Sequence, residues 1–191
     1  MNTTDKLAAR VADAILQAKE KSGRAIVAID GRCAAGKTTL AAALARVLGC
    51  DVVPMDHFFL RPEQRTQERL ACAGGNVDRE RFLDEVILPL VRGDAVSYRR
   101  FDCKTMSLGE TVSLSGGDVC IIEGSYSYHP ELREFYDLRI FLTVSPEEQF
   151  RRITFRNRDA AEIFRTRWIP LEEKYFSELD VAANCDLCFE T

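Results

Sequence analysis

The segment from Gly31 to Thr38 reads GRCAAGKT and matches the phosphate-binding pattern G-x-x-x-x-G-K-[ST]. It follows the apolar run AIVAID and precedes the alanine-rich run KTTLAAALARVLG, so the chain reads here as strand, loop and helix. Glycines at both ends of the loop let successive N–H groups turn inward toward phosphate oxygens, and the helix start adds the positive end of its dipole. The pattern predicts an α/β P-loop fold that binds a nucleotide.

We expect the whole loop to contribute to this nucleotide site. Lys37 should reach the β- and γ-phosphates and act in catalysis, and the Thr38 hydroxyl should ligate Mg²⁺. Cys33 is expected to be a small spacer rather than a redox sensor. The predicted nucleotide-binding residues of the loop are Gly31, Arg32, Cys33, Ala34, Ala35, Gly36, Lys37, Thr38 and Thr39.

The rest of the chain alternates between short apolar runs and segments with helical spacing. We expect strands at AIVAID, DVVPM, DVCIIEG, LRIFLTV and DLCFE, a small hairpin from AVSYRRF and ETVSLS, and helices at residues 4–21, after Asp78, after Ser145 and at WIPLEEKYFSEL. Residues 60–78 lack a clear apolar period and are predicted to form a long loop, with one helical turn as an option. Strands that alternate with helices favour a mainly parallel sheet covered on both faces.

Length indicates the number of domains, and net charge favours some kinds of partner over others. The 191 residues are most simply one domain, residues 1–191. With 26 basic and 30 acidic residues the net charge is -4, which disfavours nucleic acid or an anionic membrane as a partner. No apolar run approaches the roughly 18 residues that span a bilayer, and the N-terminal segment lacks signal-peptide features, so we expect a cytoplasmic protein.

The seven cysteines are spread along the chain and do not resemble a disulfide framework. The one close pair, Cys185 and Cys188, lacks two further ligands at comparable spacing, so no zinc site is predicted.

Several classes of nucleotide-binding protein share the P-loop pattern, but the rest of the sequence fits few of them. The sequence has no guanine-reading N-K-x-D segment and no room for the further domains of motor or helicase ATPases. A small kinase remains.

Two acidic residues follow apolar strands and should lie beside the P-loop. Glu123 ends VCIIE and is a candidate Mg²⁺ ligand, while Asp56 follows DVVPM and is a candidate general base for an acceptor hydroxyl. The carboxyl ends of strands in open α/β sheets share one crevice, so Lys37, Asp56 and Glu123 should meet there. His57 should point elsewhere if the backbone stays extended, because neighbouring side chains then alternate in direction.

Six segments, in order, resemble the uridine kinase and phosphoribulokinase family of P-loop kinases: DGRCAAGKTTLA, MDHFF, GNVDRERF, RRFDCKT, IIEGSY and YDLRIFLTV. The resemblance implies a three-layer α/β/α fold with a five-stranded parallel sheet of order 2-3-1-4-5. It also implies transfer of a phosphoryl group from ATP, with Mg²⁺, to a hydroxyl of a sugar, nucleoside or related small molecule.

The resemblance assigns further substrate-binding residues. Asp56 matches the family's base, and Phe59 stands where a tyrosine is frequent. Asp78 matches an acid that holds ribose hydroxyls in nucleoside kinases, although it is equally a helix cap. Phe101 and Asp102 match a segment that approaches the nucleobase. The following residues KTMSL contain no histidine, unlike those of nucleoside kinases, so the identity of the acceptor stays open.

Residues 151–167 contain six arginines: Arg151, Arg152, Arg156, Arg158, Arg165 and Arg167. Arginine suits phosphate because its planar fork bonds bidentately, and Arg152 and Arg156 share one helical face. The resemblance places this segment in a lid over the triphosphate, with Arg152 as a catalytic residue and Arg156 as a nucleotide-binding one. The alternative is a solvated face whose arginines pair with nearby acids.

Three aromatic residues of the last predicted helix, Trp168, Tyr175 and Phe176, are expected to be core residues rather than a platform for adenine. The sequence therefore predicts an ATP- and Mg²⁺-dependent kinase for a small-molecule acceptor. The alternative is a nucleotide-binding regulatory protein that phosphorylates no acceptor. The oligomeric state stays open, with a homo-oligomer as one alternative.

Overall fold

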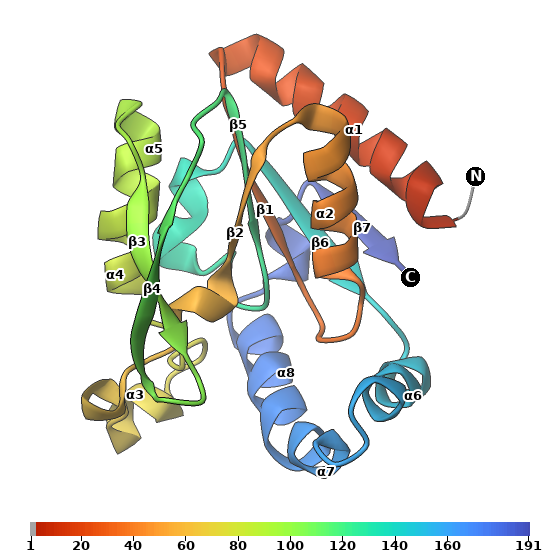
Figure 1. The fold of residues 1–191 in the computed structure, drawn as a ribbon. Coiled ribbons are helices and arrows are strands. Elements are labelled where there is room, and N and C mark those ends of the chain that lie inside the picture. The colour runs from red at the N-terminus through yellow and green to blue at the C-terminus, as the bar shows by residue number, and fades with distance from the viewer. Residues whose placement is uncertain (1–2) are drawn as a thin grey trace.

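The run AIVAID forms β1 (Ala25–Gly31), the central strand of a parallel five-stranded sheet. The computed structural model describes residues 3–191. The sheet has the order β2-β5-β1-β6-β7, which is 2-3-1-4-5 when its own strands are counted along the chain (Figure 1). The other strands are β2 (Asp51–Pro54), β5 (Val119–Glu123), β6 (Leu138–Thr143) and β7 (Leu187–Glu190). The predicted fold class is confirmed.

Strand β1 is buried on both faces, and its side chains alternate between two cores. Val27 and Ile29 join the core under α1 (Thr3–Ser22) and α2 (Lys37–Leu48). Ile26 and Ala28 join the opposite core. This period of two follows from the pleat of the strand and explains why the run is apolar throughout.

The opposite core is covered by one helical segment, the hairpin and the last helix. The helical segment runs through α4 (Arg79–Phe82), a π-helical turn and α5 (Leu88–Arg92). The predicted hairpin is present as antiparallel β3 (Ser97–Asp102) and β4 (Ser107–Ser113). The last helix contributes Tyr175 and Phe176, which are buried as predicted.

The segment from residue 146 to residue 178 differs from the prediction in its boundaries. Helix α6 (Pro146–Arg156) begins at the predicted Ser145 cap. The last helix does not begin at Trp168 but comprises α7 (Ala161–Ile163), a π-helical turn over Phe164–Trp168, and α8 (Ile169–Glu178). Likewise, residues 60–78 form a short 3₁₀ turn at Pro62–Gln64 and then α3 (Gln67–Ala71).

Both π-helical turns end two residues before a proline inside a helix. Leu88 N–H donates to the Leu83 carbonyl ahead of Pro89, and Ile169 N–H donates to the Phe164 carbonyl ahead of Pro170. A proline inside a helix removes a donor and clashes with the carbonyl four residues earlier. The wider i to i+5 turn removes that clash without ending the helix. Among residues 3–191, no helix is long and apolar enough to cross a membrane.

Gly31 ends β1 with φ 134°, and a Cβ there would collide with the backbone carbonyl of Leu142 on β6. We therefore expect Gly31→Ala to lower the free energy of unfolding by about 3 kcal/mol or more, because backbone must move. Denaturant unfolding measures this. The matched control is Gly116→Ala, which has φ 81° but no atom within 4 Å of the place that a Cβ would take, and it should cost about 1–2 kcal/mol. Equal losses in the two variants would contradict the role of the Leu142 contact.

Candidate active site

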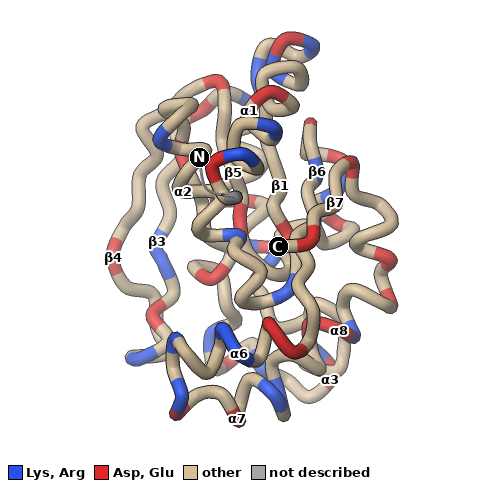
Figure 2. Tube along the Cα trace, turned by 90° about the vertical axis from the view of Figure 1, so that its right-hand side faces the viewer, with Lys and Arg blue, Asp and Glu red and all other residues tan. Residues whose placement is uncertain are grey.

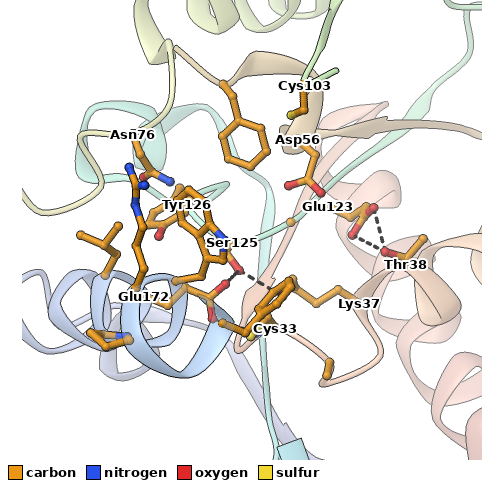
Figure 3. A pocket seen from close by; sticks show the side chains of 18 of the residues that line it. Cys33, Lys37, Thr38, Asp56, Asn76, Cys103, Glu123, Ser125, Tyr126 and Glu172 are labelled. Carbon is orange, nitrogen blue, oxygen red and sulfur yellow. Dashed lines mark hydrogen bonds between the residues drawn. The ribbon is translucent and has the colours of Figure 1, made fainter. Parts of the chain in front are cut away.

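A pocket of about 950 Å³ opens at the carboxyl ends of the sheet strands. Its walls come from the P-loop, the turn after β2, the loop around α3, the hairpin turn, the end of β5 and the helices α6 to α8. Figure 3 shows Asp56, Glu123 and Lys37 around one space, with Glu172 and Cys33 below and Asn76 and Tyr126 to one side. The crevice predicted from the strand ends is therefore present.

Lys37 is buried at the start of α2 and points back along the P-loop. Its Nζ donates to the carbonyl oxygens of Gly31 at 2.6 Å and Arg32 at 2.8 Å, and to the hydroxyl of Ser125 at 3.2 Å. Gly36 adopts the left-handed conformation directly before the helix. The amine is thus held in the mouth of the loop, where a phosphate would compete for it with neutral oxygens.

Thr38 and Glu123 meet as predicted for a Mg²⁺ site. The Thr38 hydroxyl lies 3.1 and 3.2 Å from the two carboxylate oxygens of Glu123. Burial raises the pKa of Glu123, whereas Lys37 and Thr38 lower it. Hydroxyl and carboxylate oxygens are ligands that Mg²⁺ accepts, and it keeps several water or phosphate ligands besides. The pair fits such an ion, although residues 3–191 contain no cluster of three acidic, histidine or cysteine ligands.

Asp56 lies in a 3₁₀ turn, Met55–Phe58, and its carboxylate faces the pocket. The walls of the pocket desolvate it and raise its pKa, while the charges of Lys37, His57 and Arg156 act in the opposite direction. The charge of Asp56 also raises the pKa of Glu123, because the two carboxylates repel each other. One carboxylate thus lies beside the Thr38 hydroxyl, and a second is free to accept a proton.

His57 is directed away from the pocket, as predicted, but for a different reason. The backbone is not extended here, because residues 55–58 form the 3₁₀ turn. The His57 ring instead hydrogen-bonds the Tyr98 hydroxyl on β3 at 3.0 Å, and it does not line the pocket. Burial lowers its pKa, as do the charges of Arg100 and Arg81, whereas Asp56 raises it.

Helix α8 contributes an acidic residue that no pattern in the sequence predicts. Glu172 is buried, and its carboxylate accepts the N–H of Cys33 in the P-loop at 2.9 Å and the Ser125 hydroxyl at 2.7 Å. The adjacent Glu173 forms a bidentate pair with Arg32. Helix α8 therefore holds the P-loop through two neighbouring carboxylates. Glutamates are common in exposed helices, so no local pattern distinguishes these two.

Not every residue of the P-loop faces the pocket. Cys33, Ala34, Gly36, Lys37, Thr38 and Thr39 line it, whereas Gly31, Arg32 and Ala35 do not. Burial raises the pKa of the Cys33 thiol to about 12, so it stays protonated and unreactive at neutral pH, as expected of a spacer.

Five of the six arginines of residues 151–167 fall into two groups, and the sixth, Arg158, is exposed and does not line the pocket. Arg151 and Arg165 form exposed pairs with Glu148 and Glu162, as the alternative interpretation held. Figure 2 shows basic and acidic residues close together at α6 and α7. Arg152, Arg156 and Arg167 line the pocket.

These three arginines have different partners. Arg152 donates to the Ala34 carbonyl at 3.1 Å and pairs with Glu148. Arg156 lies over the Phe164 ring, and Arg167 over the Trp168 ring. The prediction that Trp168 is a core residue is wrong, because its side chain is only half-buried and lines the pocket.

Of the acceptor-side residues predicted from the resemblance, Phe59 lines the pocket, whereas Asp78, Phe101 and Asp102 do not. Asp78 is 2% exposed. It caps α4 through the Arg81 N–H and accepts the amide of Gln64 at 2.8 Å. Its capping role is present, and an acceptor would have to displace Gln64 to reach it.

Phe101 is buried, and the Asp102 carboxylate accepts the N–H of Lys104. The hairpin turn instead brings Cys103 and Met106 to the pocket, and the loop around α3 brings Arg65, Leu70 and Asn76. These residues carry no local signal of a site, because only the fold brings their segments together.

No family model matches the sequence. The chain is similar in structure to a protein from Bacillus stearothermophilus described as a possible uridine kinase, with a TM-score of 0.65 and 23% identity over 94% of this chain and 99% of that one. It is also similar to YFH7 from Saccharomyces cerevisiae, proposed to be a P-loop kinase with a circular permutation, with a TM-score of 0.66 and 11% identity over 96% and 99% of the two chains. The chain therefore has a kinase-like P-loop fold.

The Asp78 contacts predict a structural effect. Asp78→Ala removes the cap of α4 and leaves the Gln64 amide without its acceptor, so the free energy of unfolding should fall by about 2 kcal/mol or more. Chemical denaturation measures the loss. Asp94→Ala, which breaks only an exposed pair with Arg92, is the control and should change stability by less than about 0.5 kcal/mol. If Asp78→Ala lowers the free energy of unfolding no more than the control does, the Asp78 cap does not stabilise the protein.

Proposed function

We propose that the chain is an ATP- and Mg²⁺-dependent phosphotransferase that moves the γ-phosphoryl group to a hydroxyl of a small molecule. One observation carries the proposal: Asp56 faces the same pocket as Lys37 of the P-loop and the pair formed by Thr38 and Glu123. A nucleotide-binding protein without acceptor chemistry would need the P-loop and the metal pair, but it would not need a second carboxylate facing the phosphate.

The P-loop amides and Lys37 would hold the β- and γ-phosphates, and Thr38 with Glu123 would hold Mg²⁺. The metal, when bound, neutralises charge on the phosphates. Arg152 and Arg156, which reach the pocket from α6, add positive charge on the side of the predicted lid. In phosphoryl transfer, positioning and charge stabilisation supply most of the rate.

Asp56 would accept the proton of the acceptor hydroxyl as that oxygen attacks the γ-phosphate. Its raised pKa makes it a stronger base than an ordinary aspartate, although its side chain is open to the pocket, and this suits the role. The apolar residues across the pocket, Phe59, Leu70 and Leu171 among them, would exclude water and so limit hydrolysis of ATP.

The direct test is ATP consumption in the presence of single acceptors from a panel of nucleosides, pentoses, hexoses, hydroxy acids and vitamin alcohols. We expect one class to stimulate ADP formation with Mg²⁺, and Lys37→Ala to abolish the stimulation. If the protein binds ATP but no acceptor stimulates its consumption, the regulatory alternative is favoured over a kinase. Stimulation that survives Lys37→Ala would remove the P-loop from the mechanism.

The adjacent residues Asp56 and His57 give a matched pair of variants. Asp56→Asn keeps the shape of the side chain but removes the base, so kcat should fall about 100-fold or more while ATP affinity persists. His57→Ala should change kcat by less than about 3-fold, because the ring faces Tyr98 rather than the pocket. Equal losses from the two substitutions would contradict the assignment of the base.

The pH dependence of turnover gives an independent check. Asp56 works as a base only when ionised, so kcat should fall as the pH drops through its pKa, which lies above the ordinary value of about 4. Saturating Mg²⁺ keeps the Glu123 carboxylate ionised, so the fall in kcat at low pH measures the protonation of Asp56. The residual activity of Asp56→Asn should not show this fall at low pH. If the fall is unchanged in the variant, it belongs to a group other than Asp56.

A further inference from the structure

One cation in the pocket is not explained by the P-loop, the metal pair or the lid. Arg65 lines the pocket from the loop that follows the 3₁₀ turn of Asp56. The two arginines nearest to it in the sequence both have acidic partners, Arg61 with Glu63 and Arg69 with Glu80. Arg65 has no ion-pair partner among residues 3–191, although it is half-buried.

The position of Arg65 is fixed by its surroundings. Its Nε donates to the Leu60 carbonyl at 3.0 Å, and its guanidinium lies over the Phe101 ring at 5.9 Å. The loop that carries it is closed at its base, where Asp78 N–H donates to the Phe58 carbonyl at 2.7 Å and Leu60 N–H to the Asn76 carbonyl at 3.2 Å. Buried Phe101, a predicted substrate contact, instead supports this arginine.

Arg65 lies on the acceptor side of the pocket. Its charge acts on the Cys103 thiol of the hairpin turn, as does the charge of Asp56. In Figure 3, Cys103 lies on the side of Asp56 away from Lys37 and Cys33. Arg65 is therefore grouped with the hairpin turn and the Asp56 turn rather than with the P-loop.

A guanidinium held by one nitrogen keeps its two terminal nitrogens as donors. Two parallel N–H groups match the two oxygens of a carboxylate or a phosphate. The neighbouring walls, which include Phe59, Leu70 and Met106, offer apolar surface, and no carboxylate among residues 3–191 lies within ion-pair distance of Arg65. A partly desolvated cation without a protein partner is best satisfied by an anionic ligand.

We propose that the acceptor carries an anionic oxygen group, a carboxylate or a phosphate, which Arg65 binds while the acceptor hydroxyl faces Asp56. This inference rests on the proposed kinase function. In the step, the bond from the γ-phosphorus to the β,γ-bridging oxygen breaks and a bond to the acceptor oxygen forms. The hydroxyl proton passes to Asp56, and the products are ADP and a phosphate monoester that retains the original anionic group.

The test uses matched acceptors that differ in the anionic group: glycerate with glycerol, pantothenate with pantothenol, and ribose 5-phosphate with ribose. We expect Mg²⁺-dependent ADP formation to be stimulated by the anionic member of a pair and at least 10-fold less by the neutral one. Carboxylates and the phosphate ester form separate arms, so the active pair identifies the anionic group. If these pairs are inactive, the broader hydroxy-acid and sugar-phosphate panel is run against the corresponding neutral alcohols.

Variants of Arg65 then test its part in binding. Arg65→Gln should raise the KM of the anionic acceptor about 10- to 100-fold and change the KM of ATP less than about 3-fold, with Arg65→Lys between it and the wild type. Arg92→Gln, which removes an exposed charge on α5 paired with Asp94, is the control and should change neither value.

The outcomes separate this inference from the proposed function. If neutral acceptors are phosphorylated as well as anionic ones, or if Arg65→Gln behaves like Arg92→Gln, the kinase stands and the role of Arg65 is wrong. If no acceptor of either class stimulates ADP formation, the proposed function fails and this inference fails with it. If Arg65→Gln raises the KM of ATP as much as the KM of the acceptor, Arg65 binds the nucleotide and this inference is wrong.

Discussion

The close approach of Gly31 to the backbone of β6 is the constraint on which the site depends. The chain leaves β1 in a conformation that only glycine adopts easily, and Arg32 N–H donates to the Leu142 carbonyl at 3.1 Å. The Gly31 carbonyl then accepts both Lys37 and Ser125. The register between two central strands therefore sets where the phosphate-binding loop begins and where its lysine is held.

The loop is held from a second direction by α8. Arg32 pairs with Glu173, and the Cys33 N–H donates to Glu172, which also accepts Ser125 from the end of β5. Thus the sheet and the last helix meet at the P-loop through polar contacts that are buried at Glu172 and partly exposed at Glu173. Helix α8 follows the π-helical turn that brings Arg167 and Trp168 to the pocket. One helical segment therefore both holds the P-loop and carries the pocket wall formed by these two residues.

The sequence predicted the parts of the molecule that have local causes. Glycine spacing located the P-loop, and apolar runs located all five sheet strands, because both patterns follow from backbone geometry. Asp56 and Glu123 were found because each follows a strand that ends at the pocket. Glu172 and Arg65 were missed because their roles arise from contacts between segments far apart in the sequence. The start of the last helix was misplaced because Pro170 suggests a helix start, whereas a π-helical turn carries the helix through it.

That π-helical turn has a consequence for how the pocket could diversify. It contains one residue more than an α-helical turn, and one residue corresponds to a rotation of about 100° about the helix axis. Deleting it would keep Tyr175 and Phe176 anchored in the core while turning Arg167 and Trp168 to another direction. The turn thus acts as a rotational register between two halves of one helix. A single-residue insertion or deletion there would exchange one pocket wall for another without repacking the core.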